Sequence, residues 1–262
     1  MKPPTAPPIA VVMAAGRGTR MGSELPKVLF EAAGRPLVRW VLDALAAAGV
    51  ADRIVVVGYR GEQVRDALKT LPGVSFATQQ ALRGTGDAVA AASGLVRDRL
   101  RLLPAGARLP VVVVCGDSPM LRPASVRTLL DAFEDRQAHC VLGTATTADP
   151  AGLGRIVRDP AGRFLGIVEE KDATPAERCI REVNMSTYVF EASALLRVLT
   201  RLDTANAAGE YYITDCPRLL QADGGSVAAI DCLDASETLS VNTPEQLAAV
   251  AAALAGRESP PT

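Results

Sequence analysis

Short apolar runs alternate with helix-like segments along the first half of the chain, and this alternation constrains the fold more than any other feature. The runs within 9–16, 53–59 and 109–119 are rich in valine and too short for buried helices. Segments with apolar residues at helical spacing lie between and after them, as at 36–50 and 122–135. A repeated strand–helix order predicts an α/β fold with a mainly parallel sheet covered by helices on both faces.

The second half of the chain follows a different pattern. Residues 154–173 contain two strand-like runs around Asp-Pro-Ala-Gly, a sequence typical of a hairpin turn. A strand at 181–191 and a helix at 192–202 follow, and a final helix is predicted within 243–256. We therefore expect one domain with a nucleotide-type first half and a lid-like second half.

The expected domain spans residues 9–255, between a proline-rich leader at 1–8 and a tail at 256–262 that we expect to be disordered. A net charge of −1 and a pI near 6.0 give no reason to expect a nucleic acid or a membrane as partner. The leader lacks the apolar region of a signal peptide, and no apolar stretch is long enough to span a membrane. Five scattered cysteines indicate free thiols in a reducing cytoplasm, so we expect a cytoplasmic protein.

Histidine and lysine are both scarce. A single histidine, His139, leaves almost no material for zinc sites or Ser-His-Asp chemistry, and we expect it to be structural. The four lysines are outnumbered by arginines, so Lys27 and Lys171 are candidates for positions that need a compact ammonium group.

The stretch GRGTRMGSELPKVL, residues 16–29, follows the first apolar run. Glycines let backbone amides approach an anion, and Arg20 and Lys27 can neutralise its charge. The stretch is not a P-loop, because Gly22 is followed by Ser23 instead of lysine. It is a poor dinucleotide fingerprint, because Met21 stands at the third glycine position and the second strand lacks a terminal acid. An oxidoreductase that uses NAD is therefore disfavoured.

More of the chain matches one family. MAAGRGTRMGSELPKVL resembles the signature of the sugar-nucleotide pyrophosphorylases, which are nucleotidyltransferases. Seven later segments, in order, resemble the bacterial N-acetylglucosamine-1-phosphate uridylyltransferases: QQALRGTGDAV, CGDSPML, GLGRIVRD, GIVEEKDAT, EVN, GEYYITD and VNTPEQL. The match covers roughly residues 9 to 250. It implies a Rossmann-like nucleotide-diphospho-sugar transferase fold with a sugar-binding second half.

The resemblance also implies a reaction. UMP passes from UTP to N-acetylglucosamine 1-phosphate by Mg²⁺-assisted in-line displacement, which gives UDP-N-acetylglucosamine and pyrophosphate. The attacking phosphate is already ionised near neutral pH, so no general base is needed, in keeping with one histidine. The same chemistry on another sugar 1-phosphate, such as glucose 1-phosphate, stays open. A non-catalytic sugar-nucleotide sensor would have lost Lys27, Arg20 or Asp117, and all three are present.

Site residues follow from the matched motifs. Lys27 is expected on the nucleotide phosphates and Arg20 on the leaving pyrophosphate, while Asp117 and Asn242 are expected to bind Mg²⁺. The residues expected to contact the nucleotide are Met13, Ala14, Ala15, Gly16, Lys27, Gln79, Gly84 and Thr85. The residues expected to contact the sugar are Cys115, Gly116, Gly154, Glu169, Asn184, Tyr212 and Thr214.

Some points stay open in the sequence. Cys115 stands where the family usually has tyrosine, and Met185-Ser186 stands where it has Thr-Gly, so the sugar is less constrained than the reaction. Lys171 either approaches a phosphate or pairs with Glu169. Asn242 could instead cap the last helix, unless Thr243 does so. The family's enzymes also carry a β-helix with acetyltransferase activity; since these 262 residues contain no hexapeptide repeats, we expect no such activity and a monomer.

Overall fold

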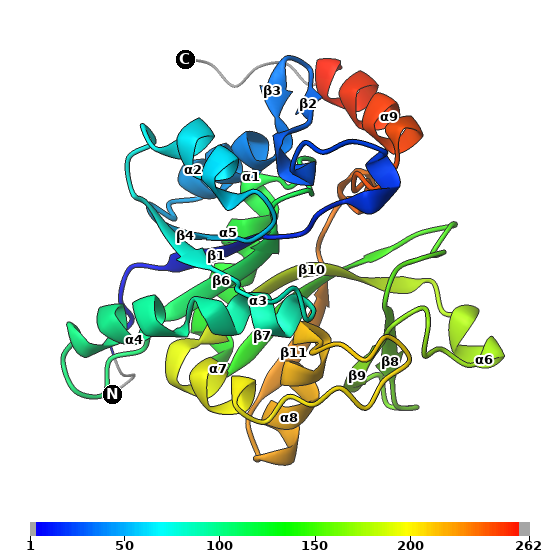
Figure 1. The fold of residues 1–262 in the computed structure, drawn as a ribbon. Helices are drawn as coiled ribbons and strands as arrows, with labels where there is room; N and C mark the ends of the chain where they lie inside the picture. The colour runs from blue at the N-terminus through cyan, green and yellow to red at the C-terminus, as the bar shows by residue number, and fades with distance from the viewer. Residues whose placement is uncertain (1–3, 257–262) are drawn as a thin grey trace.

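The computed structural model of the chain describes residues 4–256, and Figure 1 shows their arrangement. The strands are β1 (Ile9–Ala14), β2 (Glu31–Ala32), β3 (Arg35–Pro36), β4 (Asp52–Val57), β5 (Val74–Thr78), β6 (Pro110–Cys115), β7 (Cys140–Thr146), β8 (Arg155–Arg158), β9 (Phe164–Val168), β10 (Glu182–Glu191) and β11 (Val227–Asp231). The α-helices are α1 (Leu37–Ala47), α2 (Gly61–Leu68), α3 (Thr85–Ala91), α4 (Ser93–Arg101), α5 (Pro123–Arg136), α6 (Pro175–Arg178), α7 (Ala192–Leu199), α8 (Cys216–Ala222) and α9 (Pro244–Ala255). Four short 3₁₀ helices are η1 (Thr19–Met21), η2 (Lys27–Leu29), η3 (Ile213–Asp215) and η4 (Ala235–Thr238).

The central sheet has the strand order β11-β7-β10-β6-β1-β4-β5. Its pairs are parallel except where β10 runs antiparallel between β6 and β7. The hairpin β8–β9 lies off this path and is joined to it through β10. The predicted mainly parallel α/β sheet is therefore confirmed, and the hairpin belongs to the second half, where a lid-like part was expected.

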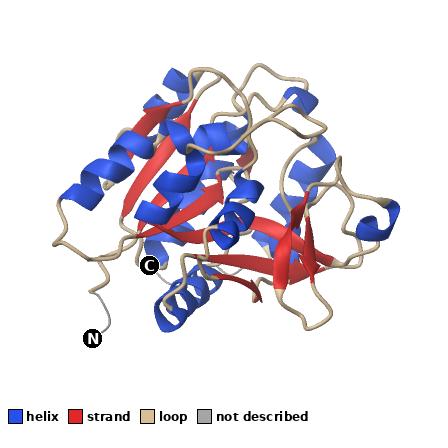
Figure 2. Cartoon of the chain, turned by 90° about the horizontal axis from the view of Figure 1, so that it is seen from below, coloured by secondary structure: helices blue, strands red, loops and turns tan. Residues whose placement is uncertain are grey.

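Helices cover both faces of the sheet (Figure 2). Alternate residues of a strand point to opposite faces, and the valines of β1 show it. Val11 packs in a core with α3, α4, α7 and α8, whereas Val12 packs in a second core with α1, α2 and α5. The valine-rich strands are buried on both faces, which explains their continuous apolar runs.

Two local features of the first half are not revealed by the sequence pattern. The glycine-rich stretch does not lead straight into α1, because the hairpin β2–β3 intervenes and packs with α9 through Ala32, Val250 and Leu254 (Figure 1). Two-residue strands carry no periodic signal, so the sequence pattern does not reveal them. The helical segment between β5 and β6 is divided at Ala92 into α3 and α4.

The prediction of a disordered leader is wrong for residues 4–8. Thr5 forms a parallel bridge with Arg108, and Ala6 N donates to the Arg108 carbonyl at 2.8 Å. Pro4 has no amide hydrogen to offer, but its carbonyl accepts from Arg108 N at 2.9 Å. The expectations for residues 1–3 and 257–262 lie outside the described residues.

Other expectations about the chain as a whole can be checked within the same residues. The five cysteines carry free thiols, as expected. Across residues 4–256, the longest apolar helical stretch falls short of what a membrane crossing requires.

Candidate active site

The glycine-rich stretch after β1 folds as a tight loop that brings Lys27 back toward the sheet. Gly18 has φ 67°, in the left-handed region that side chains avoid. A Cβ placed on Gly18 would lie only 2.7 Å from Lys27 Cβ. The loop therefore needs glycine at this position, both for its backbone conformation and so that the stem of Lys27 can pack against it.

Four residues predicted for phosphate and metal binding meet beyond the carboxyl ends of β1 and β6. Lys27 Nζ forms an ion pair with Asp117 and donates to Asn242 Oδ1 at 2.7 Å. Arg20 Nη2 donates to the same Asn242 oxygen at 2.8 Å. Val241 N donates to the Asp117 carbonyl at 3.3 Å, which holds the segment before α9 against the loop after β6. We call Arg20, Lys27, Asp117 and Asn242 the phosphate-side cluster.

The donor set of this cluster fits a magnesium ion. The oxygens of Asp117 and Asn242 both contact Lys27 Nζ, so they converge on one position that already holds a positive charge. No group of three or more His, Cys, Asp or Glu side chains is arranged to hold a metal in residues 4–256. Two protein oxygens, completed by phosphate oxygens and water, are a donor set that Mg²⁺ accepts.

The open question about Asn242 is answered by its neighbour. Thr243 is the N-cap of α9, and its hydroxyl accepts from Gln246 N at 3.3 Å. The side chain of Asn242 is thereby left to face Lys27 and Arg20 instead of capping the helix.

Most of the predicted nucleotide contacts line one cavity of about 300 Å³ beside this cluster. The predicted residues in its wall are Met13, Ala15, Gly16, Gln79, Gly84 and Thr85, together with Cys115 and Asp117. Ala14 is absent from that wall, because its side chain lies on the opposite face of β1 and packs in the core with α1. Sequence reasoning missed the wall residues Arg17, Leu82, Ala88 and Glu210, although all four lie within the quoted motifs.

Gln79 is held rigidly at the edge of this cavity. The side chain is buried, and Nε2 donates to Gly84 O at 3.1 Å and to Asp87 Oδ2 at 2.8 Å. With both amide hydrogens used, its oxygen is the atom that remains for a ligand. Gly84 has φ 107°, and a Cβ there would lie 2.5 Å from the Tyr211 carbonyl, so glycine is required where this loop meets the second half of the chain.

A second group of predicted residues gathers around the carboxylate of Glu169. Thr214 Oγ1 donates to Glu169 Oε1 at 2.9 Å, and a Cβ added at Gly154 would lie 3.5 Å from Glu169 Oε2. Asn184 N donates to the Gly154 carbonyl at 2.8 Å. Burial, with smaller contributions from nearby acids, raises the pKa of Glu169 above its ordinary value. We call Gly154, Glu169, Asn184 and Thr214 the sugar-side pocket.

A smaller cavity of about 180 Å³ joins the two groups. Its wall includes Asn184, Met185 and Ser186 on one side and Asp117 and Asn242 on the other. Cys115 lines both cavities, and burial raises the pKa of its thiol to about 12, so it stays protonated. Ser186 has φ 48°, so a non-glycine residue occupies the left-handed region where the related family has glycine.

Two predicted sugar contacts have other surroundings. Gly116 is buried, and its amide donates to the Met13 carbonyl at 2.9 Å, so it ties the end of β6 to β1 and is absent from the walls of both cavities. Tyr212 is half-buried just before η3, where burial and the nearby carboxylates of Asp172 and Glu169 raise its pKa to about 12.

The structure bears on one of the two alternatives for Lys171, the pairing with Glu169. Lys171 is exposed, and within residues 4–256 no ion pair joins it to Glu169. Glu170 instead pairs with Arg155 at 2.7 Å and accepts from Gly152 N at 3.1 Å. Arg155 is only 2% exposed, so this ion pair fastens the start of β8 to the residue after Glu169, and the Gly152 contact holds the loop before Gly154 to the same carboxylate. Sequence reasoning missed it, although Arg155 lies within a quoted motif.

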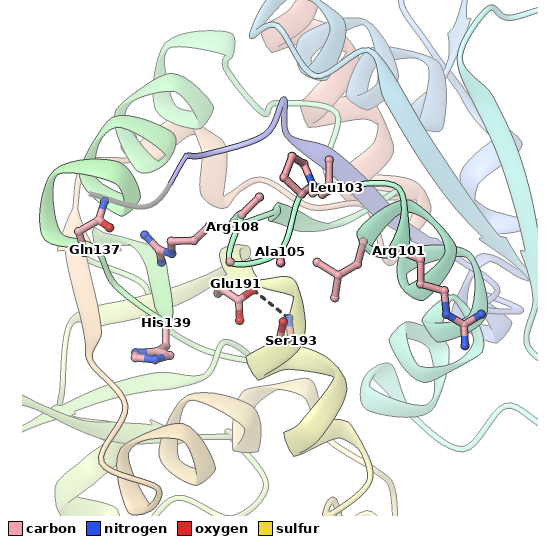
Figure 3. Close-up of a pocket in the computed structure, with 12 residues that line it drawn as sticks. Arg101, Leu103, Ala105, Arg108, Gln137, His139, Glu191 and Ser193 are labelled. Atoms are coloured by element: carbon pink, nitrogen blue, oxygen red, sulfur yellow. Dashed lines mark hydrogen bonds between the residues drawn. The ribbon is translucent and has the colours of Figure 1, made fainter. Parts of the chain in front are cut away.

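A further cavity, of about 480 Å³, lies at the other end of the sheet, where β6 begins and β10 ends (Figure 3). Two of its polar side chains bond to the fold: Glu191 caps α7 through Ser193 N, and Arg108 Nη2 donates to the Ala138 carbonyl, while Arg108 Nη1 is buried without a partner among residues 4–256. His139, which was expected to be structural, bonds to Ser226. This cavity is therefore distinct from the strand ends at which ligands of open α/β sheets bind.

The phosphate-side cluster and the two adjoining cavities lie at the carboxyl ends of parallel strands, which is where ligands of open α/β sheets bind. The profile of the family described as the MobA-like NTP transferase domain matches residues 10–212, and the chain belongs to this family of nucleotidyltransferases.

Individual relatives share a large part of the sequence. The chain is 44% identical over 248 residues to the bifunctional protein GlmU of Heliobacterium modesticaldum, an alignment that covers 95% of this chain and 52% of that protein. Identity to the bifunctional protein GlmU of Thermobifida fusca is 43% over 243 residues, covering 92% of this chain and 49% of the relative. The chain thus spans about half the length of the curated relatives it matches.

Solved structures support the fold. A UDP-glucose pyrophosphorylase complexed with UDP-glucose superposes with a TM-score of 0.73 at 16% identity, covering 95% of this chain and 99% of that one. The apo form of UDP-glucose pyrophosphorylase gives a TM-score of 0.71 at 16% identity, covering 95% and 98%. At this identity the likeness establishes a shared architecture, and the expected nucleotide-diphospho-sugar transferase fold is confirmed.

Proposed function

We propose that the chain transfers UMP from UTP to N-acetylglucosamine 1-phosphate, releasing pyrophosphate and forming UDP-N-acetylglucosamine. One observation carries the proposal: Arg20, Lys27, Asp117 and Asn242 converge between a cavity suited to a nucleobase and a group of polar side chains around the half-buried carboxylate of Glu169. The ordered motifs shared with the bacterial uridylyltransferases support this assignment of the two substrates.

The reaction joins two polyanions, so charge neutralisation is its main requirement. An oxygen of the sugar phosphate attacks the α-phosphorus of UTP, and the bond to the bridging oxygen of pyrophosphate breaks with its electrons. Lys27 and Arg20 bind phosphate oxygens, and the glycine-rich loop offers backbone amides. Asp117 and Asn242 hold Mg²⁺, which supplies further neutralisation of the phosphates when bound.

Residues in and beside the two cavities account for selection of the substrates. The oxygen of Gln79 accepts from the N3–H of uracil, a donor that cytosine lacks. Glu169 accepts from sugar hydroxyls, and Asn184 offers both a donor and an acceptor to an acetamido group. The half-buried thiol of Cys115 and the bend at Ser186 border the same pocket, so these two positions bear on which sugar is preferred.

The test is pyrophosphate release with Mg²⁺ and UTP, comparing N-acetylglucosamine 1-phosphate, glucose 1-phosphate and glucosamine 1-phosphate. Preference for the N-acetylated sugar is the expected result. Preference for another sugar would retain the chemistry and locate the change at Cys115 and Met185-Ser186. No release with any of the three would overturn the proposal and point to another nucleotide or to the sensor hypothesis.

A further inference from the structure

Tyr188 is a buried polar residue that the proposed reaction leaves unused. It lies on β10 with no exposed surface, and its ring stacks on Phe190 with centroids 5.5 Å apart. Its hydroxyl accepts a hydrogen bond from Asn184 Nδ2 at 2.8 Å. Burial holds the pKa of the phenol well above its ordinary value, so the hydroxyl is neutral.

The backbone of β10 is bent so that this contact can form. In a regular strand, residues four apart lie about 13 Å from one another, too far for their side chains to bond. Here the pairing of β10 with β7 shifts register between Asn184 and Tyr188, and Ser186 has φ 48°. The irregularity brings the amide and the phenol together at the wall of the 180 Å³ cavity.

The hydrogen bonds of Asn184 leave a defined remainder for a ligand. One hydrogen of Nδ2 goes to Tyr188, and Oδ1 accepts from Ser186 N at 3.3 Å. One amide hydrogen and one oxygen lone pair are left. Because the contact to Ser186 is the longer of the two, the Tyr188 hydroxyl is the stronger restraint on the plane of the amide.

We infer that Tyr188 is a positioning residue, whose hydroxyl holds the amide of Asn184 in the orientation that binds the sugar part of the sugar 1-phosphate. This inference rests on the proposed function. It assigns Tyr188 no contact with the substrate, since the side chain is fully buried and acts only through Asn184.

The experiment begins with Tyr188→Phe, which removes the oxygen and keeps the ring. We expect the KM for the sugar 1-phosphate to rise about tenfold, because a binding amide loses its restraint and a buried N–H its partner. The KM for UTP stays within about twofold. Phe190→Leu is the matched control: it loosens the same ring stack but keeps the hydrogen bond, so it lowers Tm and leaves the sugar KM unchanged.

A double-mutant cycle separates positioning from general packing. If Tyr188 acts through Asn184, Tyr188→Phe has no further effect on sugar KM in an Asn184→Ala background. An equal rise in both backgrounds overturns the inference, as does a sugar KM that Tyr188→Phe leaves unchanged.

A readout without turnover keeps this inference distinct from the proposed function. In ¹⁵N spectra the side-chain amide of Asn184 is assigned by its loss in Asn184→Ala, and we expect Tyr188→Phe to shift it. Titration with the sugar 1-phosphate in the presence of UDP then compares binding by the two proteins. If the unmodified protein binds no sugar phosphate, the proposed function fails; if both proteins bind equally well, the Tyr188 inference fails alone.

Discussion

The phosphate-side cluster and the sugar-side pocket use polar side chains in opposite ways. In the first, Lys27 and Asp117 keep 12% and 21% of their side chains exposed and pair by charge. In the second, Asn184 is 5% exposed, and the carboxylate of Glu169 has a raised pKa because of burial. The first is partly solvated and charged, whereas in the second a half-buried carboxylate is surrounded by the buried residues Asn184 and Thr214 and fixed by a hydrogen bond.

The difference fits the proposed function, in which the first region binds phosphates and the second binds a sugar. Phosphates bring their own charge and a metal ion, so the ion pair between Lys27 and Asp117 has to open before they bind. Contact with solvent lowers the energy needed to open this pair. A sugar offers neutral hydroxyls, which are recognised well only by groups that are held in place and desolvated. Changes in the first region should therefore act on turnover, and changes in the second on sugar KM.

The largest effect is expected from Asp117→Ala. It removes a proposed metal ligand and leaves Lys27 without its carboxylate, so we expect kcat/KM to fall by about 10³ or more with the fold intact. Pyrophosphate release and the far-UV CD spectrum check the two parts. Asp135→Ala, an exposed site on α5, is the control. Activity like that of the unmodified protein would remove Asp117 from the metal site.

Lys27→Ala is expected to lower the rate by about 10² to 10³, the usual scale for one contact to transition-state charge. A loss of less than about threefold would contradict the phosphate role. The same variant should bind Mn²⁺ without nucleotide about tenfold more tightly, because the ammonium no longer pairs with Asp117 and Asn242. Electron paramagnetic resonance of free Mn²⁺ measures this, and Lys69→Ala, an exposed lysine after α2, is the control.

The two regions also differ in how far sequence predicts them. The valine runs predict the sheet, although they do not predict its strand order. Because the carboxyl ends of parallel strands meet at one edge, the sequence also predicts that the loops after β1 and β6 lie together. The sequence does not predict the ion pair of Arg155 with Glu170 or the register shift before Tyr188. Both depend on contacts between segments that no local pattern links. The pairing of Thr5 with Arg108 escapes prediction for the same reason.

Glu169→Gln tests the sugar-side pocket. We expect the sugar KM to rise about tenfold while the KM for UTP is unchanged, because an amide replaces a carboxylate acceptor. The variant should also be more stable at pH 7. A carboxyl whose folded pKa is raised stabilises the fold at low pH and loses that contribution as pH rises through the raised pKa.

Thermal melts at two pH values check the sign of that stability effect. The gain in Tm should be present at pH 7 and absent near pH 4, below the ordinary pKa of glutamate of about 4.3. Glu62→Gln, an exposed glutamate on α2, should show neither effect. If the Glu169→Gln variant is less stable than the parent at pH 7, the hydrogen bonds of the carboxylate offset more than the cost of its burial.

The smallest and most local effect is expected from Thr214→Val. It removes the hydroxyl that donates to Glu169 Oε1 at 2.9 Å, so the sugar KM should rise about threefold.

That hydrogen bond lowers the pKa of Glu169 against the effect of burial, so its loss should raise this pKa further. The acidic limb of sugar kcat/KM then moves to higher pH, while the same limb for UTP does not move. Thr204→Val, at an exposed threonine, is the control. A shift of both limbs together would mean that the two regions titrate as one unit, and the contrast between a solvated phosphate side and a fixed sugar side would no longer hold.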